Sequence, residues 1–414
     1  MKARALLIDM ECGPLQETMK SNLGSLFDDA QFVMDVYGSG NNFAHGFQEH
    51  GPKYHKTFEE ALGKIAETCD SLQSFVLTHS LGGGTGSGVG SYVLGMLDDL
   101  YPSVARFTTS VFPAEDDDVV TSPYNSILAA RQIIQHADCS FPLDNAALQA
   151  FAQLEVNPRK GREEKEEDIG VKKKRQGRGF DSMNNTAALM LCHLTASSRH
   201  AGQMNVDLNE ISTNLVPFRR MPFLLTAMSP QRSLATHASK SRVADSSRLT
   251  LNRAIGDVLG AAGQLSAALP TSTHSLTLAS ALLSRGNIEL SEVLAGVSQV
   301  RRTLRFPSWN EDACKIGLCG VPSPGREASI LAIYNSTAFG SVLSRQLTAF
   351  QRLFRRRAML HHYTEFMEED EIFAAEECVS ALVEQYSALE NGTWKPASAM
   401  GGESYASRLL FPAF

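Results

Sequence analysis

The chain has 414 residues, too many for one compact core, so two or three domains are expected. Its hydrophobic content of 43% and charged content of 20% are typical of a globular protein, and a net charge of −7 argues against wholesale nucleic-acid binding. The seven cysteines are scattered and form no C-x-x-C pair, which predicts free thiols in a reducing compartment. We find no signal peptide and no long apolar segment, and therefore expect an intracellular chain that does not span a membrane.

The first part of the chain alternates between strand and helix patterns. Buried strands are predicted over residues 3–10, 72–80, 106–112 and 137–143, and helices over residues 54–69, 89–100 and 124–136. Strands that alternate with helices predict a parallel sheet covered by helices. A highly charged stretch over residues 157–179 predicts a disordered surface insertion. A helix is predicted from Phe180 to Ala201, mixed strands and helices over 274–340, and charged helices over 341–390.

The most informative motif is the sequence Gly-Gly-Gly-Thr-Gly-Ser-Gly at residues 82–88, which we call the glycine loop. It lies between an apolar strand and an amphipathic helix, so its N–H groups and the positive end of the helix dipole could meet an anion. Glycines let the backbone approach a ligand closely and turn through positive φ. The motif is neither a P-loop nor a dinucleotide fingerprint. It predicts a phosphate site, and a simple tight connection is the alternative.

Other polar residues are candidate ligand-binding residues because they follow predicted strands or lie in turns. Asp9 and Glu11 end the first strand, where they could hold magnesium through water or cap the strand end. Asn41 lies in a turn-rich segment that could place amides near a phosphate. Asn145 follows a strand and Asn184 opens a helix, and an asparagine can read both donor and acceptor edges of a purine.

In this order, the segments resemble the tubulin family over nearly the whole chain. The resemblance is carried by ARALLIDME, GSGNNFAHG, THSLGGGTGSG, SPYNSILA, HADCSFPLDN, NVDLNEISTNLVPF, SRGNI and AMLHHYTEFMEEDE. The glycine loop matches the tubulin signature, of which a related form occurs in the bacterial division protein FtsZ. Among tubulins, GSGNN, EDDDVVTSPYNS, the FDSMNN segment with its charged insertion and the lack of a glutamate-rich tail look most like the epsilon branch.

The resemblance implies an α/β fold of the tubulin/FtsZ type. This is a Rossmann-type parallel sheet with helices on both faces, a smaller α+β second domain and a C-terminal helical layer. We expect a GTP-binding domain over 1–201, an intermediate domain over 202–340, C-terminal helices over 341–390 and a tail over 391–414. Tubulins begin with a further strand and a Gly-Gln-Cys-Gly-Asn loop that this sequence lacks. We therefore expect unpaired edges on the neighbouring strands and low affinity for GTP.

The resemblance also implies roles for individual residues. Asp9 and Glu11 match the acidic pair on the magnesium side, Asn41 a residue near the terminal phosphate, and Asp118 a position in the loop near the ribose. Asn145 and Asn184 match asparagines that recognise guanine, and Phe180 matches a tyrosine that stacks on the base. The residues that match the segment around the GTP phosphates are Gly82, Gly83, Gly84, Thr85, Gly86 and Ser87.

Asp207 and Glu210 form a second candidate site. Asp-x-x-Glu before an apolar run resembles a capping box at the start of a helix. In tubulins this loop contacts the nucleotide of the next subunit. Alpha-tubulin carries at the position of Glu210 a glutamate that orients the attacking water, and beta-tubulin carries lysine. We hypothesise that Glu210, with Asp207 beside it, acts on the GTP of a partner, so that hydrolysis requires assembly.

The favoured function is that of a tubulin-superfamily GTP-binding cytoskeletal protein with GTP and magnesium as cofactors. The epsilon resemblance implies a role in centriole, basal-body and triplet-microtubule organisation, and a cytoplasmic location at the centrosome or basal body. The expected partners are other tubulins, delta-tubulin among them, and centriolar or microtubule proteins, with no nucleic acid and no membrane. The alternative is a nucleotide-independent interaction module with an incomplete GTP pocket and partner-binding C-terminal helices.

Overall fold

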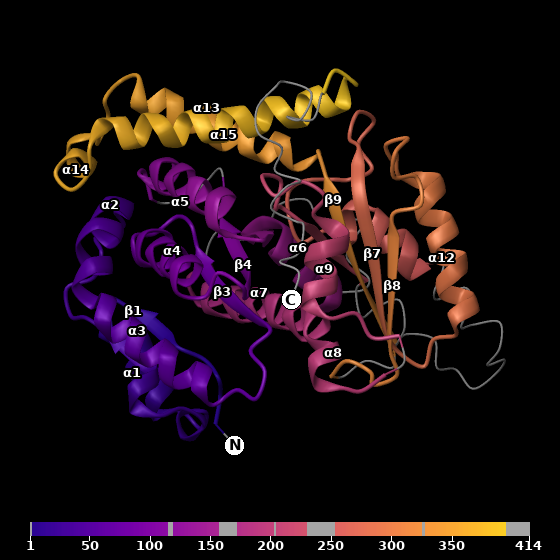
Figure 1. Cartoon of the computed structure of the whole chain (residues 1–414), viewed down its shortest axis with the longest axis horizontal. Helices are drawn as coiled ribbons and strands as arrows, with labels where there is room; N and C mark the ends of the chain where they lie inside the picture. Colours follow the sequence, from indigo (N-terminus) through magenta and orange to yellow (C-terminus); the bar gives the residue numbers. More distant parts are fainter. Residues whose placement is uncertain are drawn as a thin grey trace, which may run out of the picture.

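The computed structural model describes residues 2–114, 119–156, 172–202, 204–229, 253–324 and 328–394, with only the backbone for residues 155–156 and 172–179. Parallel strands occupy the middle of the molecule, a mixed sheet lies beside them, and a helical layer crosses both (Figure 1). This is the expected α/β fold with a smaller α+β part and a C-terminal helical layer.

Two separate parallel sheets form the first part. β1 (Leu7–Asp9) pairs with β2 (Phe32–Met34), and β3 (Ser74–Ser80), β4 (Ala105–Phe112) and β5 (Cys139–Asp144) form the second sheet in that order. β4 is almost wholly buried because it has a neighbour on each side and an apolar and β-branched sequence. Among the described strands, β1 and β3 each pair along one edge only, as expected. The first strand is shorter than the predicted 3–10.

Helices connect and cover these strands, and most follow the predicted pattern. They are α1 (Cys12–Lys20), α2 (Phe43–His45), α3 (Gly51–Glu67), α4 (Gly90–Leu100), α5 (Ser122–His136), α6 (Asn145–Val156), α7 (Lys172–Leu194) and α8 (Ala196–Arg199).

One boundary prediction is wrong. α7 begins at Lys172 and not at Phe180, because the lysines, arginines and glutamine of the charged stretch are good helix formers. The remainder of the predicted disordered insertion, residues 157–171, lies outside the described residues.

The second part is a mixed sheet. β6 (Leu225–Met228), β7 (Thr277–Gly286), β8 (Cys314–Cys319) and β9 (Ala328–Ser336) are arranged in the order β6-β9-β7-β8. β9 runs antiparallel to both neighbours, and β8 runs parallel to β7. α9 (Leu208–Leu215) and α12 (Leu290–Thr303) pack on this sheet. β5 connects the two parts, because the backbone N–H of Ser140 donates to Pro222 O and its carbonyl accepts from Leu224 N.

The C-terminal layer consists of α13 (Phe339–Phe354), α14 (His361–Thr364) and α15 (Glu369–Glu390). α13 and α15 pack against each other and both lie on α5 (Figure 1). None of the helices in the described ranges is long and apolar enough to cross a lipid bilayer. The seven cysteines are all free, as predicted.

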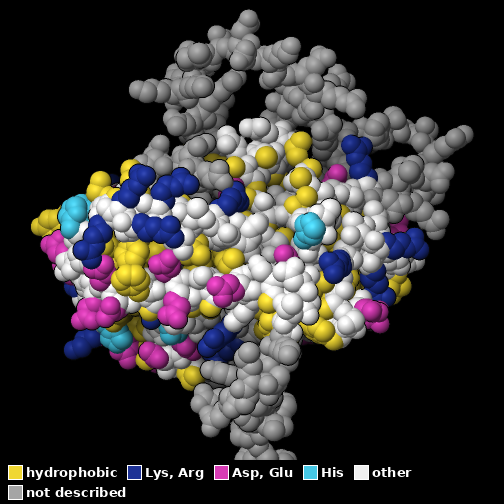
Figure 2. All heavy atoms as spheres, turned by 90° about the horizontal axis from the view of Figure 1, so that it is seen from above, with side chains coloured by type: hydrophobic (Ala, Val, Ile, Leu, Met, Phe, Trp, Pro, Cys, Tyr) yellow, Lys and Arg dark blue, Asp and Glu magenta, His cyan; other side chains and the backbone are white. Residues whose placement is uncertain are grey.

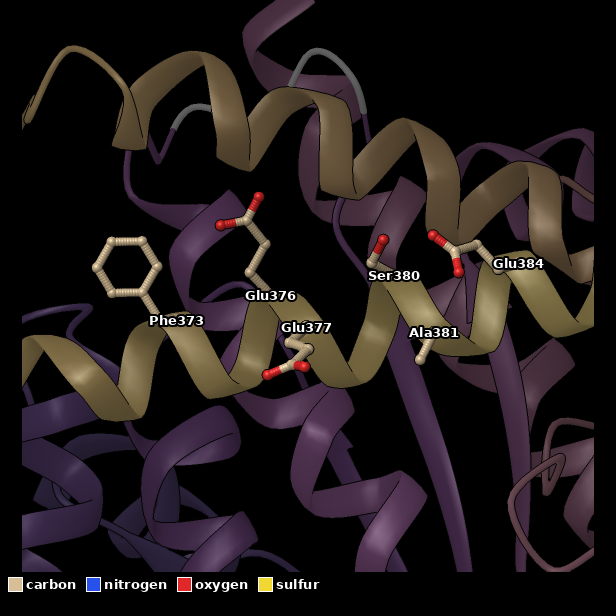
Figure 3. A pocket seen from close by; sticks show the side chains of 6 residues that line it. All are labelled: Phe373, Glu376, Glu377, Ser380, Ala381 and Glu384. Carbon is tan, nitrogen blue, oxygen red and sulfur yellow. The ribbon is translucent and has the colours of Figure 1, made fainter. Parts of the chain in front are cut away.

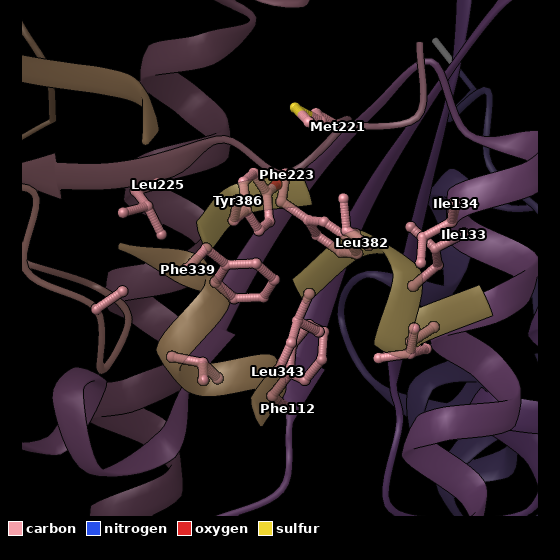
Figure 4. Close-up of a cluster of buried hydrophobic side chains, with 14 of the residues drawn as sticks. Phe112, Ile133, Ile134, Met221, Phe223, Leu225, Phe339, Leu343, Leu382 and Tyr386 are labelled. Atoms are coloured by element: carbon pink, nitrogen blue, oxygen red, sulfur yellow. The ribbon is translucent and has the colours of Figure 1, made fainter. Parts of the chain in front are cut away.

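Three aromatic rings join the three parts of the fold. Phe112 at the end of β4, Phe223 before β6 and Phe339 at the start of α13 are fully or almost fully buried. The ring centroids of Phe223 and Phe339 are 4.6 Å apart, and those of Phe112 and Phe339 are 5.5 Å apart. Figure 4 shows them among Leu343, Leu382 and other apolar side chains of the same cluster. Since every part contributes a ring, loss of one ring weakens the contact between all three.

Replacing Phe339 with alanine is expected to lower the free energy of unfolding by about 3–5 kcal/mol, through lost burial and the cavity left behind. The matched control is Phe373→Ala in the same helical layer, where the ring is 50% exposed. Chemical denaturation measures both. A loss of less than about 1 kcal/mol for Phe339→Ala would contradict the role of this cluster.

Candidate functional site

The glycine loop lies at the edge of the parallel sheet where the strands end. Ser80, at the end of β3, is in register with Val111 of β4, which is in register with Leu143 of β5. The segments that follow the three strands therefore begin side by side. They are the glycine loop after β3, the segment with Asp118 after β4, and Asn145 at the start of α6. Asp118 itself lies outside the described residues.

The glycines of this loop are needed for contact with the protein's own backbone. A Cβ atom at Gly84 would lie 2.7 Å from Asn42 N, and one at Gly88 would lie 2.4 Å from Phe43 O. Real Cβ atoms do not approach backbone so closely. The expectation that the loop turns through positive φ is wrong. Gly38 and Gly40 have positive φ, whereas no residue of the glycine loop does.

A π-helical turn over Thr85–Val89 leads from the glycine loop into α4. The first N–H groups of a helix have no partner within it, so the amides of Thr85, Gly86 and Ser87 are suited to an anion, whereas Gly88 N–H donates to Gly84 O. The Ser87 side chain, however, is buried and its hydroxyl donates to Gly83 O. Ser87 can therefore offer a ligand its backbone amide but not its hydroxyl.

The turn from Gly38 to Asn42 packs against the glycine loop. Gly38, Gly40 and Asn41 have φ values of 67°, 57° and 52°, and asparagine is one of the few other residues that tolerate this region. The turn brings the exposed Asn41 side chain close to the loop, since its Oδ1 lies 3.6 Å from the Cβ position of Gly83. The structure thus brings Asn41 and the glycine loop together.

Asn125 of α5 holds the loop and the turn in place, and the sequence reasoning did not single it out. Its side chain is fully buried, and its Nδ2 donates to Asn41 O and to Gly82 O, each at 2.8 Å. Its Oδ1 accepts from the backbone N–H of Phe43 at 2.9 Å. A buried asparagine inside the apolar helix pattern YNSILAA was the available signal, because a buried amide needs partners.

The His79 side chain connects the glycine loop to the parallel sheet through hydrogen bonds. Its Nδ1 lies 2.8 Å from Gly86 O and its Nε2 lies 2.9 Å from Ser110 Oγ. Burial lowers the pKa of His79 to about 4, so the ring is neutral near pH 7. Nδ1–H then donates to Gly86 O, and Nε2 accepts from the Ser110 hydroxyl. These two hydrogen bonds connect the glycine loop to β3 and β4.

Asp9 and Glu11 lie beside the Gly38–Asn42 turn. The Asp9 carboxylate accepts from the backbone N–H of Glu11, and Glu11 Oε1 lies 3.3 Å from the Cβ position of Gly38. The described residues contain no group of three or more possible metal ligands. Two carboxylates fit magnesium nonetheless, because this ion usually combines one or two of them with water and phosphate oxygens.

The residues expected to contact the guanine base, Asn145, Phe180 and Asn184, lie on two neighbouring helices. α6 and α7 pack side by side, and the Asp144 carboxylate accepts from the amides of Ala146 and Ala147, which fixes the start of α6 at Asn145. Phe180 is 56% exposed, and Asn184 is exposed one helical turn further along α7. The exposed Phe180 offers a face for a planar ring, and the exposed Asn184 offers polar groups for the edge of that ring, whereas Asn145 is half-buried.

Asp207 and Glu210 lie apart from the glycine loop. α9, which carries them, packs on β7, and Figure 1 shows it well separated from α4. Asp207 caps α9, since its Oδ1 accepts from Glu210 N at 2.7 Å. The half-exposed Glu210 carboxylate pairs with Lys315 Nζ of β8 at 2.5 Å. Asp207 therefore caps the helix, as one of the two predictions for this segment stated. The ion pair of Glu210 with Lys315 was not predicted from the sequence.

A separate groove runs along α15 and has different chemistry. It is lined by Phe373, Glu376, Glu377, Ser380, Ala381 and Glu384 (Figure 3). The three carboxylates would repel a phosphate chain, so this groove does not compete with the glycine loop as a nucleotide site.

Comparisons with known proteins give the family. Residues 1–153 match the family described as "Tubulin/FtsZ family, GTPase domain", and residues 219–348 match "Tubulin C-terminal domain". The chain is similar to the tubulin epsilon chain of Mus musculus, at 41% identity over 94% of this chain and 82% of the relative. The tubulin epsilon chain of Homo sapiens is 40% identical over the same shares, and the tubulin beta chain of Pneumocystis carinii is 30% identical over 94% of this chain and 83% of the relative.

The buried His79 gives stability a specific pH dependence. The folded pKa of about 4 lies below the ordinary 6.5, so between these values the unfolded chain binds a proton that the folded chain does not. The free energy of unfolding should therefore increase by about 3 kcal/mol as the pH rises from 4 to 6.5. Above pH 6.5 His79 is neutral in both states, so its contribution no longer changes with pH.

In His79→Asn, the amide can still donate to Gly86 O but does not titrate. Its free energy of unfolding should lack this rise, whereas the contribution of His50, whose pKa is also lowered by burial, remains in both proteins. Denaturation of both proteins at pH 4 and pH 7 measures the difference. Equal pH dependence in the two would show that His79 is not buried neutral.

Proposed function

The chain belongs to the tubulin family, and from this we propose that it binds GTP with magnesium at the glycine loop. The observation that carries the proposal is the packing of the glycine loop against the Gly38–Asn42 turn at the carboxyl edge of a parallel sheet. This arrangement puts the start of a helix, backbone amides and the Asn41 side chain in one place, where a phosphate chain would be met by donors.

The neighbouring residues support the other parts of the nucleotide. Asp9 and Glu11 would hold magnesium, which neutralises phosphate charge when it is bound. Phe180 would stack on the base, and Asn145 and Asn184 would read its polar edge. The Asp118 segment would lie near the ribose.

We further propose that hydrolysis needs a neighbouring subunit. The Glu210 carboxylate is half-exposed and lies away from the glycine loop of its own chain, so a nucleotide that it reaches would be held by another subunit. Lys315 offsets its negative charge, which lowers the repulsion between Glu210 and an approaching phosphate chain. Glu210 would polarise the attacking water, and Asp207 would fix the start of the helix that carries it.

We infer the cellular role from the similarity to tubulin epsilon chains. We propose a function in centriole or basal-body and triplet-microtubule organisation, at the centrosome and in the cytoplasm, with delta-tubulin and other tubulins as partners. The two similar tubulin epsilon chains support this proposal.

Equilibrium dialysis with radiolabelled GTP tests the nucleotide site. The protein is expected to bind GTP in the micromolar range with magnesium, and Asn184→Ala should weaken binding about tenfold through a lost base contact. Asn185→Ala is the matched control, since Asn185 is an exposed neighbour on the same helix. Absence of binding by the unmodified protein would favour a nucleotide-independent interaction module, and equal loss in both variants would remove Asn184 from the site.

Glu210→Ala tests the trans arrangement. GTP binding by the isolated protein should be unchanged, and partner-stimulated phosphate release should fall about a hundredfold because no carboxylate polarises the water. Asn209→Ala, on the exposed face of the same helix, is the control. Phosphate release is measured with a coupled assay after adding partner tubulins. Unchanged stimulated release in Glu210→Ala would contradict the role of this residue.

A further inference from the structure

We propose that Tyr363, in the C-terminal helical layer, is a positioning residue for the GTP phosphates and acts through Asn125. The inference rests on the proposed function, because it concerns how the glycine loop and the Gly38–Asn42 turn are held for the nucleotide. Tyr363 lies in α14, and 238 residues separate it from Asn125 in the sequence. It is also fully buried, so it would not touch the ligand itself.

The Tyr363 hydroxyl completes the hydrogen bonds of Asn125. It donates to Asn125 Oδ1 at 2.6 Å, beside the Phe43 amide that donates to the same oxygen. The two N–H bonds of the carboxamide point to Asn41 O and Gly82 O. A carboxamide can make two donor and two acceptor bonds, so all four positions of Asn125 are occupied. Burial raises the pKa of Tyr363, so the hydroxyl keeps its proton and stays a donor.

The position of the hydroxyl fixes the orientation of the amide. With a donor on each side of Oδ1, the NH₂ group must face the two carbonyls, which belong to the turn and to the glycine loop. Without the Tyr363 hydroxyl, a buried acceptor site is left unmet, and one of the two restraints on the amide is lost. The glycine loop and the turn would then be held less firmly relative to each other, and a ligand would have to order them when it binds.

Tyr363 is itself held by two neighbouring contacts. Its ring packs on Tyr124, with centroids 4.9 Å apart, and the Tyr124 hydroxyl donates to Ala358 O at 2.9 Å. Asn42 Nδ2 donates to His362 O at 2.7 Å. The α14 region is thus joined to the turn and to α5, and the layer that carries it forms the face seen in Figure 2, where basic, acidic and apolar side chains are mixed. Whatever shifts α14 shifts the hydroxyl that orients Asn125.

Three tyrosine-to-phenylalanine variants separate this role from general stability. Tyr363→Phe keeps the ring on Tyr124 and removes the hydroxyl, which donates to Asn125 Oδ1 at 2.6 Å and makes a longer contact of 3.4 Å with Thr121 O. Tyr124→Phe removes a bond between α5 and the same C-terminal segment but leaves Asn125 untouched. Tyr386→Phe, in α15, removes a buried hydroxyl that has no hydrogen-bond partner among the described residues.

Two readouts are needed. The first is the dissociation constant for GTP with magnesium, which should rise about tenfold in Tyr363→Phe and less than about twofold in the other two variants. The second is hydrogen exchange of the nucleotide-free protein, where Tyr363→Phe should speed exchange of the amides in residues 39–43 and 82–88. Tyr124→Phe and Tyr386→Phe should leave exchange there unchanged.

The outcomes decide between the proposals. If the unmodified protein binds no GTP, the proposed function fails, and the exchange rates alone test whether Tyr363 positions the two segments. If it binds GTP and Tyr363→Phe has the same affinity and loop exchange as the unmodified protein, the inference is overturned. Equal weakening in Tyr124→Phe also overturns it, because the effect would then come from the anchoring of the segment and not from the bond to Asn125.

Discussion

The candidate site depends on the close contact between two stretches of backbone, and the Asn125 carboxamide holds that contact. Gly84 and Gly88 allow the glycine loop to lie against residues 42–43 at distances that exclude any side chain. Asn125 then bonds to both stretches and to the C-terminal layer, and each of its polar positions is used. Because an unmet buried amide costs free energy, this network favours one arrangement of the loop and the turn. The amides that could meet a phosphate are therefore set in place before any ligand arrives.

This arrangement changes the meaning of the glycine-rich motif. The sequence suggests that the glycines let the chain approach a ligand, and the structure shows that Gly84, Gly86 and Gly88 already touch backbone of the same protein. His79 adds a support beneath the loop through Gly86 O, and Ser87 uses its hydroxyl inside the loop. In the proposed site, backbone amides and Thr85 would contact the phosphates, and the carboxylates at the end of β1 would act through magnesium. A binding loop of this kind is rigid because it is packed, not because its sequence is stiff.

Much of the fold could be predicted from local patterns. Buried apolar runs identified β3, β4 and β5, and helical spacing identified α3, α4 and α5, because these signals depend on near neighbours in sequence. The start of α7 was misjudged because composition indicated disorder where helix propensity prevailed. The sequence identified Glu210 as an acid that follows a capping residue. Its ion pair with Lys315 could not be predicted, because the packing of α9 on the mixed sheet brings the two residues together. Asn125 and Tyr363 were not found for the same reason, since only the folded chain brings them together.

The most direct test of the account is an experimental structure of this protein with GTP and magnesium. The account predicts phosphates on the amides that follow Gly83, magnesium beside Asp9 and Glu11, and the guanine ring on Phe180 between Asn145 and Asn184. It also predicts that the Asn125 hydrogen bonds are unchanged from those described here, because the site is held in place before binding. Nucleotide bound elsewhere, or a glycine loop that separates from the Gly38–Asn42 turn when GTP binds, would contradict it.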